Sequence, residues 1–192
     1  MNPRTHPLSF LVSAILVVLA GPAYAVPQAN AGPLGTVAFE QALDRVSNDL
    51  RLMCVAAHPD DEDGATLARY RYRYGVKTYV VLATRGEGGQ NEIGPELYEE
   101  LGVIRTRESI AATEVVGAEL HFLDLPEFGF SKTRAETLAI WGEDEATGRM
   151  VRLIRELRPH VIITHHGRLQ DHGHHQATGH ILKAAFDLAG DA

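Results

Sequence analysis

The stretch LMCVAAHPDDE, residues 52–62, decides the fold of this chain because its character changes abruptly at His58. Six apolar residues precede the histidine, and three carboxylates follow the proline beside it. A short, continuous apolar run is typical of a strand that is buried on both faces, as in a parallel sheet. Clustered carboxylates repel one another unless a positive group lies among them or solvent screens them. We therefore predict a buried strand that ends either in a solvated acidic loop or in part of a functional site.

Strand-like and helix-like segments alternate along the rest of the chain. Three further apolar runs are short enough for strands: residues 78–83, 120–123 and 160–164. Helix-like segments follow the strands in turn: residues 65–74, 95–116, 135–157 and 176–188. Gly75 and Gly117 stand where helix C-caps belong, and residues 36–50 have the spacing of a short amphipathic helix. The pattern predicts an α/β fold, a Rossmann-like and mostly parallel sheet flanked by helices.

The two ends of the sequence suggest its domain organisation. Residues 1–25 contain Arg4, then an apolar core, and end in the small-x-small pattern AYA. This pattern predicts a signal peptide rather than a retained anchor. Residues 26–35 are expected to form a flexible leader, and residues 36–192 a single domain. We expect export to the periplasm or the extracellular space. Because the sequence stops just after a helix, we also expect it to be an incomplete copy of a longer protein that lacks its last strand or strands.

The composition excludes some classes of partner. The formal charge is −7 and no run of lysines or arginines is present, so we expect neither nucleic acid nor an anionic membrane surface as a partner. The single cysteine, Cys54, lies within the apolar run and cannot form an internal disulfide, so we expect it to pack in the core. The oligomeric state cannot be read from the sequence.

Polar residues gather in three loops that leave the predicted strands at their carboxyl ends, where open α/β sheets form their ligand sites. The loops cover residues 58–62, 84–92 and 165–176, and six of the ten histidines lie between residues 165 and 180. Imidazole and carboxylate are the usual companions around zinc. His58, Asp61 and a histidine of the last loop would give three ligands and leave a position for water. The alternative is a histidine-rich loop that is a weak metal trap or is merely solvated.

These residues resemble a known family. AHPDDE at residues 57–62, followed much later by a histidine pair spaced H-x-x-H, is similar to the PIG-L/LmbE-like family of zinc-dependent N-acetylglucosamine deacetylases. The resemblance covers residues 51–184 and includes TRGEGG, the pair Arg105 and Glu108, and RPHVIITHH. It implies a zinc cofactor and a small N-acetylated sugar or glycoconjugate as the substrate.

The resemblance also implies roles for particular residues. His58, Asp61 and His175 would bind zinc, Asp60 would be the general base, and His172 would stabilise the oxyanion. The sequence departs from the commoner H-P-D-H form, because His174 stands where an aspartate often does. A divalent metal other than zinc stays open.

Further side chains are candidates for substrate contact. Arg105 matches an arginine of the family that reaches the active site; its alternative is a surface arginine paired with Glu100 or Glu108. Glu87 lies in a glycine-rich loop that could close over substrate, and Asp124 ends the third predicted strand. Trp141 could stack on a sugar, but within a long helix we expect it in the core.

The leading hypothesis is therefore an exported zinc amidohydrolase that removes acetyl from an N-acetylglucosamine-type sugar by means of a metal-activated water. Two readings compete with it. One is a non-catalytic zinc- or carbohydrate-binding protein, which would have no need of Asp60 as a base. The other is a metal-dependent phosphoesterase, which usually requires two metals.

Overall fold

The computed structural model describes residues 34–89, 91–167 and 172–191. The predicted signal peptide and nearly all of the predicted leader lie outside these residues. Within them, no helix is both long enough and apolar enough to cross a membrane.

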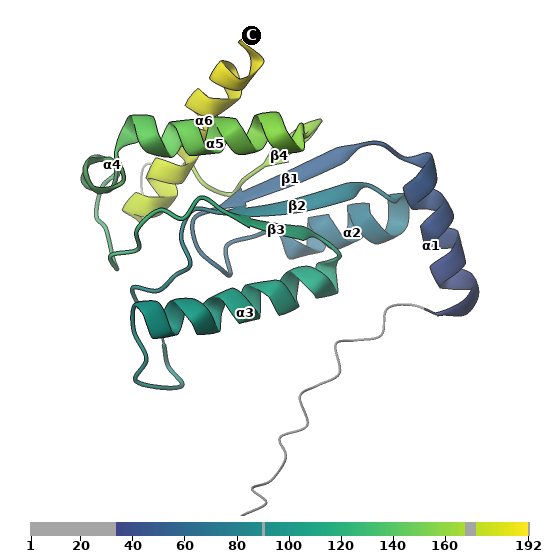
Figure 1. Cartoon of the computed structure of the whole chain (residues 1–192), viewed down its shortest axis with the longest axis horizontal. Coiled ribbons are helices and arrows are strands. Elements are labelled where there is room, and N and C mark those ends of the chain that lie inside the picture. Colours follow the sequence, from purple (N-terminus) through teal and green to yellow (C-terminus); the bar gives the residue numbers. More distant parts are fainter. Residues whose placement is uncertain (1–33, 90, 168–171, 192) are drawn as a thin grey trace, which may run out of the picture.

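A four-stranded parallel sheet forms the centre of the molecule (Figure 1). Its strands are β1 (Arg51–Ala56), β2 (Lys77–Leu82), β3 (Glu119–Phe122) and β4 (Val161–Ile163). They lie in the order β3-β2-β1-β4, so β1 and β2 are the central strands. Both are buried along nearly their whole length, as their apolar runs predict. The α/β fold class is confirmed.

Helices cover both faces of the sheet (Figure 1). One face packs against α2 (Gly64–Tyr74) and α3 (Glu99–Val116), and the other against α4 (Arg134–Trp141), α5 (Glu143–Leu157) and α6 (Gly173–Gly190). Alternate residues of β1 serve the two cores: Cys54 packs with Leu67 of α2, whereas Met53 packs with Met150 of α5. Cys54 and Trp141 are buried, as predicted.

The first helix, α1 (Gly35–Ser47), forms where the amphipathic pattern predicts it. It contacts α2, but none of its residues is buried, and Phe39 and Val46 are largely exposed.

Among the differences from the predicted helices, three concern the helices α3 to α6. The helix expected at 135–157 is divided into α4 and α5 at Gly142, whose φ of 72° is outside the helical range. α3 begins at Glu99 rather than at residue 95. α6 begins at Gly173, so His174 and His175 lie in its first turn and not in a loop. The reason is local: the Nδ1 atom of His172 accepts the backbone N–H of His174 at 3.0 Å and caps the helix.

Candidate metal centre

Each of the four consecutive carboxylates that follow Pro59 has its own hydrogen-bond or ion-pair partner, and these partners offset the repulsion between the negative charges. Asp63 caps α2 by accepting the backbone N–H of Thr66 at 2.9 Å, and hydrogen bonds from Thr66 lower the pKa of its carboxyl. Glu62 accepts the backbone N–H of Asp60 at 2.9 Å. Asp60 pairs with a guanidinium, and Asp61 with imidazoles, as described below. The acidic run is therefore an ordered turn whose carboxylates have specific partners, and not a solvated acidic loop.

His58, Asp61 and His175 form a triangle of possible ligand atoms. The Nδ1 atom of His58 lies 3.1 Å from Oδ2 of Asp61 and 3.2 Å from Nε2 of His175, and the last two atoms are 3.2 Å apart. Ligands at zinc distances around a tetrahedral ion lie roughly 3.3 Å from one another. The donor set and its spacing therefore fit a small divalent cation such as zinc.

Charge coupling within this triangle is strong. Burial disfavours a charged His58 ring, but hydrogen bonds with Asp61 and Glu127 outweigh burial and raise the pKa of His58 to about 9. Burial likewise opposes ionisation of Asp61, yet its hydrogen bonds with His175 and His58 lower the pKa of this carboxyl well below its ordinary value. The site is built to keep a positive charge beside Asp61, whether a proton or a cation carries it.

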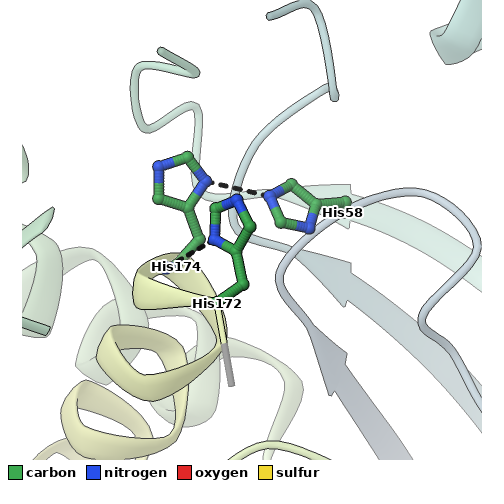
Figure 2. Close-up of side chains that lie close together, drawn as sticks. All are labelled: His58, His172 and His174. Atoms are coloured by element: carbon green, nitrogen blue, oxygen red, sulfur yellow. Dashed lines mark hydrogen bonds between the residues drawn. The ribbon is translucent and has the colours of Figure 1, made fainter. Parts of the chain in front are cut away.

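The other ring nitrogen of His58 faces a second group of buried residues. Its Nε2 atom lies 2.9 Å from Nδ1 of His174 and 3.3 Å from Oε2 of Glu127. Figure 2 shows the His174 ring turned toward His58 from the start of α6, with His172 beside it. His58, His172 and His174 make up a second set of three possible ligands, on the opposite side of the His58 ring.

Glu127 is the residue that sequence reasoning missed. It lies in the loop between β3 and α4, and its side chain is only 4% exposed. Burial raises the pKa of Glu127, but hydrogen bonds with His174 and His58 outweigh burial and lower it below the ordinary value. The available signal was weak: one carboxylate in a loop that leaves a strand at its carboxyl end.

Asp60 and Arg105 meet beside the triangle. Nη2 of Arg105 donates to the backbone oxygen of Pro59 at 2.7 Å and lies 3.3 Å from Oδ2 of Asp60, while Nη1 donates to the oxygen of Gly86 at 3.3 Å. The Arg105 side chain is 12% exposed. Arg105 is thus a clamp between two loops of the site, not a surface arginine.

His172 lies on the other side of the same cavity. Burial, followed by the neighbouring histidines, lowers the pKa of His172 to about 4, so its ring is neutral at pH 7. Both ring nitrogens of His172 accept backbone N–H groups: Nδ1 accepts that of His174 at 3.0 Å, and Nε2 accepts that of Ser131 at 3.4 Å, the longer contact.

A cavity of about 330 Å³ brings these groups together. The predicted residues that line it are His58, Asp60, Asp61, Arg105, His172 and His175. Gly86, Gly88 and Gly89 form one wall, so backbone rather than side chains limits the cavity there.

Two predicted substrate residues lie elsewhere. Glu87 lines a neighbouring cavity of about 660 Å³ beside α3, where its carboxylate accepts the backbone N–H of Arg85. Asp124 is 60% exposed and forms an ion pair with Arg85 at 2.7 Å. The structure therefore does not bring Glu87 and Asp124 into the cavity of His58.

His166 contacts the triangle through His175. Its ring stacks on His175 with centroids 4.3 Å apart, and its Nε2 atom accepts the backbone N–H of Ala57 at 2.9 Å. His165 is largely exposed, and its Nε2 atom lies 3.9 Å from Asp63.

Comparison with known proteins finds a family model and curated relatives that match most of the chain. The family model described as PIG-L, GlcNAc-PI de-N-acetylase, matches residues 53–186. A 1D-myo-inositol 2-acetamido-2-deoxy-alpha-D-glucopyranoside deacetylase of Mycobacterium leprae is 34% identical over 166 residues, which cover 77% of this chain and 53% of that protein. A mycothiol S-conjugate amidase of Streptomyces coelicolor is 33% identical over 162 residues, with 76% and 55% covered. The chain spans about half the length of the curated relatives it matches.

Solved structures share the fold. The N,N'-diacetylchitobiose deacetylase of Pyrococcus horikoshii superimposes with a TM-score of 0.58 at 21% identity, covering 82% of this chain and 61% of that one. A 4-carboxy-2-hydroxymuconate hydratase of Pseudomonas putida has a TM-score of 0.62 at 20% identity, with 73% and 57% covered. A deacetylase and a hydratase on one fold mean that the reaction must be argued from the site.

Proposed function

The chain belongs to the PIG-L (GlcNAc-PI de-N-acetylase) family, and from this premise we propose that it is a zinc-dependent hydrolase that removes the acetyl group from an N-acetylglucosamine-type sugar or glycoconjugate. One observation carries the proposal. The triangle of His58, Asp61 and His175 shares a cavity with a carboxylate, Asp60, that does not belong to the triangle. A binding protein would need the triangle alone, whereas amide hydrolysis needs a base beside it.

The residues divide the work of hydrolysis. His58, Asp61 and His175 would hold the cation, which when bound polarises the acetyl carbonyl and lowers the pKa of a water molecule. Asp60 takes a proton from the attacking water and returns it to the amine as the carbon–nitrogen bond breaks. His172, with its proton on Nε2 in place of the 3.4 Å contact from the N–H of Ser131, would donate to the carbonyl oxygen as negative charge develops on it, an interaction worth about 3 kcal/mol at comparable sites.

Arg105 orients Asp60 beside the cavity. The guanidinium lies 3.3 Å from the carboxylate and also donates to the backbone oxygens of Pro59 and Gly86. Arg105 thereby positions the base and the glycine wall relative to each other.

The test pairs metal analysis with acetate release. Wild type, Asp60→Asn and a remote control, Asp187→Asn on the exposed side of α6, are loaded with zinc and assayed on GlcNAc-containing substrates. We expect one zinc per chain in all three proteins, and at least a 100-fold loss of acetate release only in Asp60→Asn.

The other outcomes lead elsewhere. Zinc bound by the wild type without acetate release from any N-acetylated sugar supports the zinc- or carbohydrate-binding alternative. Absence of bound metal from the wild type contradicts the site.

We also propose that the protein acts outside the cytoplasm, on an envelope or extracellular glycan. The support is the signal-peptide pattern of residues 1–25. N-terminal sequencing of the protein recovered from its natural compartment is expected to begin at Val26, and an intact Met1 on the mature protein would contradict export by cleavage.

A further inference from the structure

The outer nitrogen of His58 meets two buried polar groups that the proposed mechanism does not use. Glu127 reaches it from the loop after β3, and His174 reaches it from the first turn of α6. Their side chains are 4% and 0% exposed. Burying a carboxylate and an imidazole carries a desolvation cost, so their placement against His58 calls for a physical account.

Glu127 is held rigidly. One carboxylate oxygen accepts the hydroxyl of Thr84 at 2.9 Å, and the other accepts the backbone N–H of Gly129 at 2.8 Å. Gly88 makes this position possible, because a Cβ atom there would lie 2.7 Å from Cγ of Glu127. The carboxylate therefore faces His58 in one fixed orientation.

His174 is held by packing rather than by hydrogen bonds alone. Its ring meets Phe128 edge-on, with centroids 4.4 Å apart, and lies 5.1 Å from Trp141. Its Nδ1 atom is 2.9 Å from Nε2 of His58, while its Nε2 atom has no hydrogen-bond partner among the described residues. The polar contact of this ring is thus directed at His58 and Glu127.

We propose that Glu127 and His174 are positioning residues that fix the metal-binding form of His58. The Nε2–H of His58 donates to Nδ1 of His174, 2.9 Å away, and faces Oε2 of Glu127 at 3.3 Å. The ring then has its proton on Nε2 and presents an unprotonated Nδ1 to the cation beside Asp61 and His175. A carboxylate behind a metal-binding histidine fixes its tautomer and orientation, and its removal typically weakens metal binding by about 10- to 100-fold.

The same atoms are poorly arranged for a second cation. The 2.9 Å separation between His58 and His174 is a hydrogen-bond distance, shorter than the roughly 3.3 Å between two ligands of one tetrahedral ion. The third member of that set, His172, uses Nδ1 to accept the backbone N–H of His174. The geometry favours a supporting hydrogen-bond network over a second metal.

The inference rests on the proposed metal site. Its test therefore measures zinc affinity and not the rate of acetate release. Zinc affinity is measured by competition with a chromophoric chelator for the wild type, Glu127→Gln and the double variant Glu127→Gln/His174→Asp. The Asp oxygen of the double variant would stand close to where Nδ1 of His174 stands, within reach of His58. We expect a loss of affinity of about 10- to 100-fold in Glu127→Gln, largely recovered in the double variant.

Control variants separate positioning from folding. Glu136→Gln alters another carboxylate of the same region, one that accepts hydrogen bonds from Ser131 and Lys132, and is expected to bind zinc like the wild type. Glu127→Asp keeps the charge but withdraws it from His58 by one methylene, so an intermediate loss is expected. This variant serves in place of Glu127→Gln if the latter does not fold.

The possible failures are distinguishable. Folded Glu127→Gln with wild-type affinity overturns the positioning role and leaves the proposed reaction intact. Two zinc ions per wild-type chain would assign these atoms to a second cation and overturn the inference. A wild type that binds no zinc contradicts the proposed metal site and the inference together, whereas zinc binding without acetate release contradicts only the proposed reaction.

Discussion

At the scale of single residues, Asp60 has an unusual backbone. Its φ is 94°, a region that L side chains rarely adopt and that is sustained only when neighbouring contacts fix it. Two contacts do so here: Arg105 donates to the oxygen of the preceding Pro59, and the N–H of Asp60 itself donates to Glu62. The side chain is 67% exposed, so packing does not require this conformation. A strained, exposed residue beside the metal triangle fits a role in chemistry better than a role in stability.

This strain gives a stability prediction. Asp60→Gly removes the steric cost of the positive φ, while Asp60→Asn keeps both the Cβ atom and the strain. We expect Asp60→Gly to be more stable than Asp60→Asn by about 1 kcal/mol, since strain of 1–3 kcal/mol is partly offset by the entropy of glycine. Both variants should be inactive. Urea unfolding of the two metal-free proteins measures the difference, and equal midpoints would mean that the backbone at Asp60 is relaxed.

The sequence allowed some site residues to be grouped but not others. His58 and Asp61 could be grouped with a histidine of the segment after the fourth predicted strand, because parallel strands bring their carboxyl ends to one edge, and the family resemblance then implied His175. Glu127 lies in a loop with no motif, and its role depends on contacts with β1 and α6 that no local pattern encodes. Glu87 and Asp124 follow strands as well, but their side chains turn toward Arg85. Direction of a loop side chain is decided by tertiary packing.

At the scale of elements, the strands could be predicted because burial on both faces leaves a continuous apolar run. The ends of the helices were harder to predict from the sequence. The break between α4 and α5 lies at Gly142, whose φ is 72°, and three acidic residues in the first turn of α5 follow it, a signal of a helix start that the sequence prediction passed over. The start of α6 depends on a histidine acting as a cap, whereas Ser, Thr, Asp and Asn are the usual residues at that position.

The contact between two loops at the sheet edge gives an element-scale prediction. A Cβ atom at Gly88 would lie 2.6 Å from the backbone nitrogen of Gly129, whereas one at Gly89 would have no heavy atom within 4 Å. We expect Gly88→Ala to destabilise the protein by about 1–3 kcal/mol and to lower zinc affinity by displacing Glu127. Gly89→Ala is the matched control and should stay within about 0.5 kcal/mol of the wild type. Equal unfolding curves for the two variants would contradict the close approach of the loops.

At the scale of the whole molecule, the candidate metal centre joins segments that are distant in sequence. His58 and Asp61 follow the central strand β1, and His175 lies more than a hundred residues later at the start of α6. α6 packs on α4 and α5 and also contacts β1. A cation held by these residues therefore links the sheet to the helical layer formed by α4, α5 and α6. Because unfolding would separate the ligands, binding of the cation should stabilise the entire fold and not only the site.

Cys54 provides a reporter for this coupling. It lies within β1, is 1% exposed, and burial raises the pKa of its thiol to about 11, so the native state offers a labelling reagent neither access nor thiolate. Maleimide labelling should therefore require opening of the core. With zinc at about 100 times its dissociation constant we expect labelling to slow by about 100-fold, the mass-action effect of a ligand that binds only the folded state. An added thiol at an exposed position, Val46→Cys, should react quickly at a rate that zinc leaves unchanged. If bound zinc does not slow the labelling of Cys54, then β1 opens without disrupting the metal centre. The metal centre would then not link the sheet to the helical layer of α4, α5 and α6.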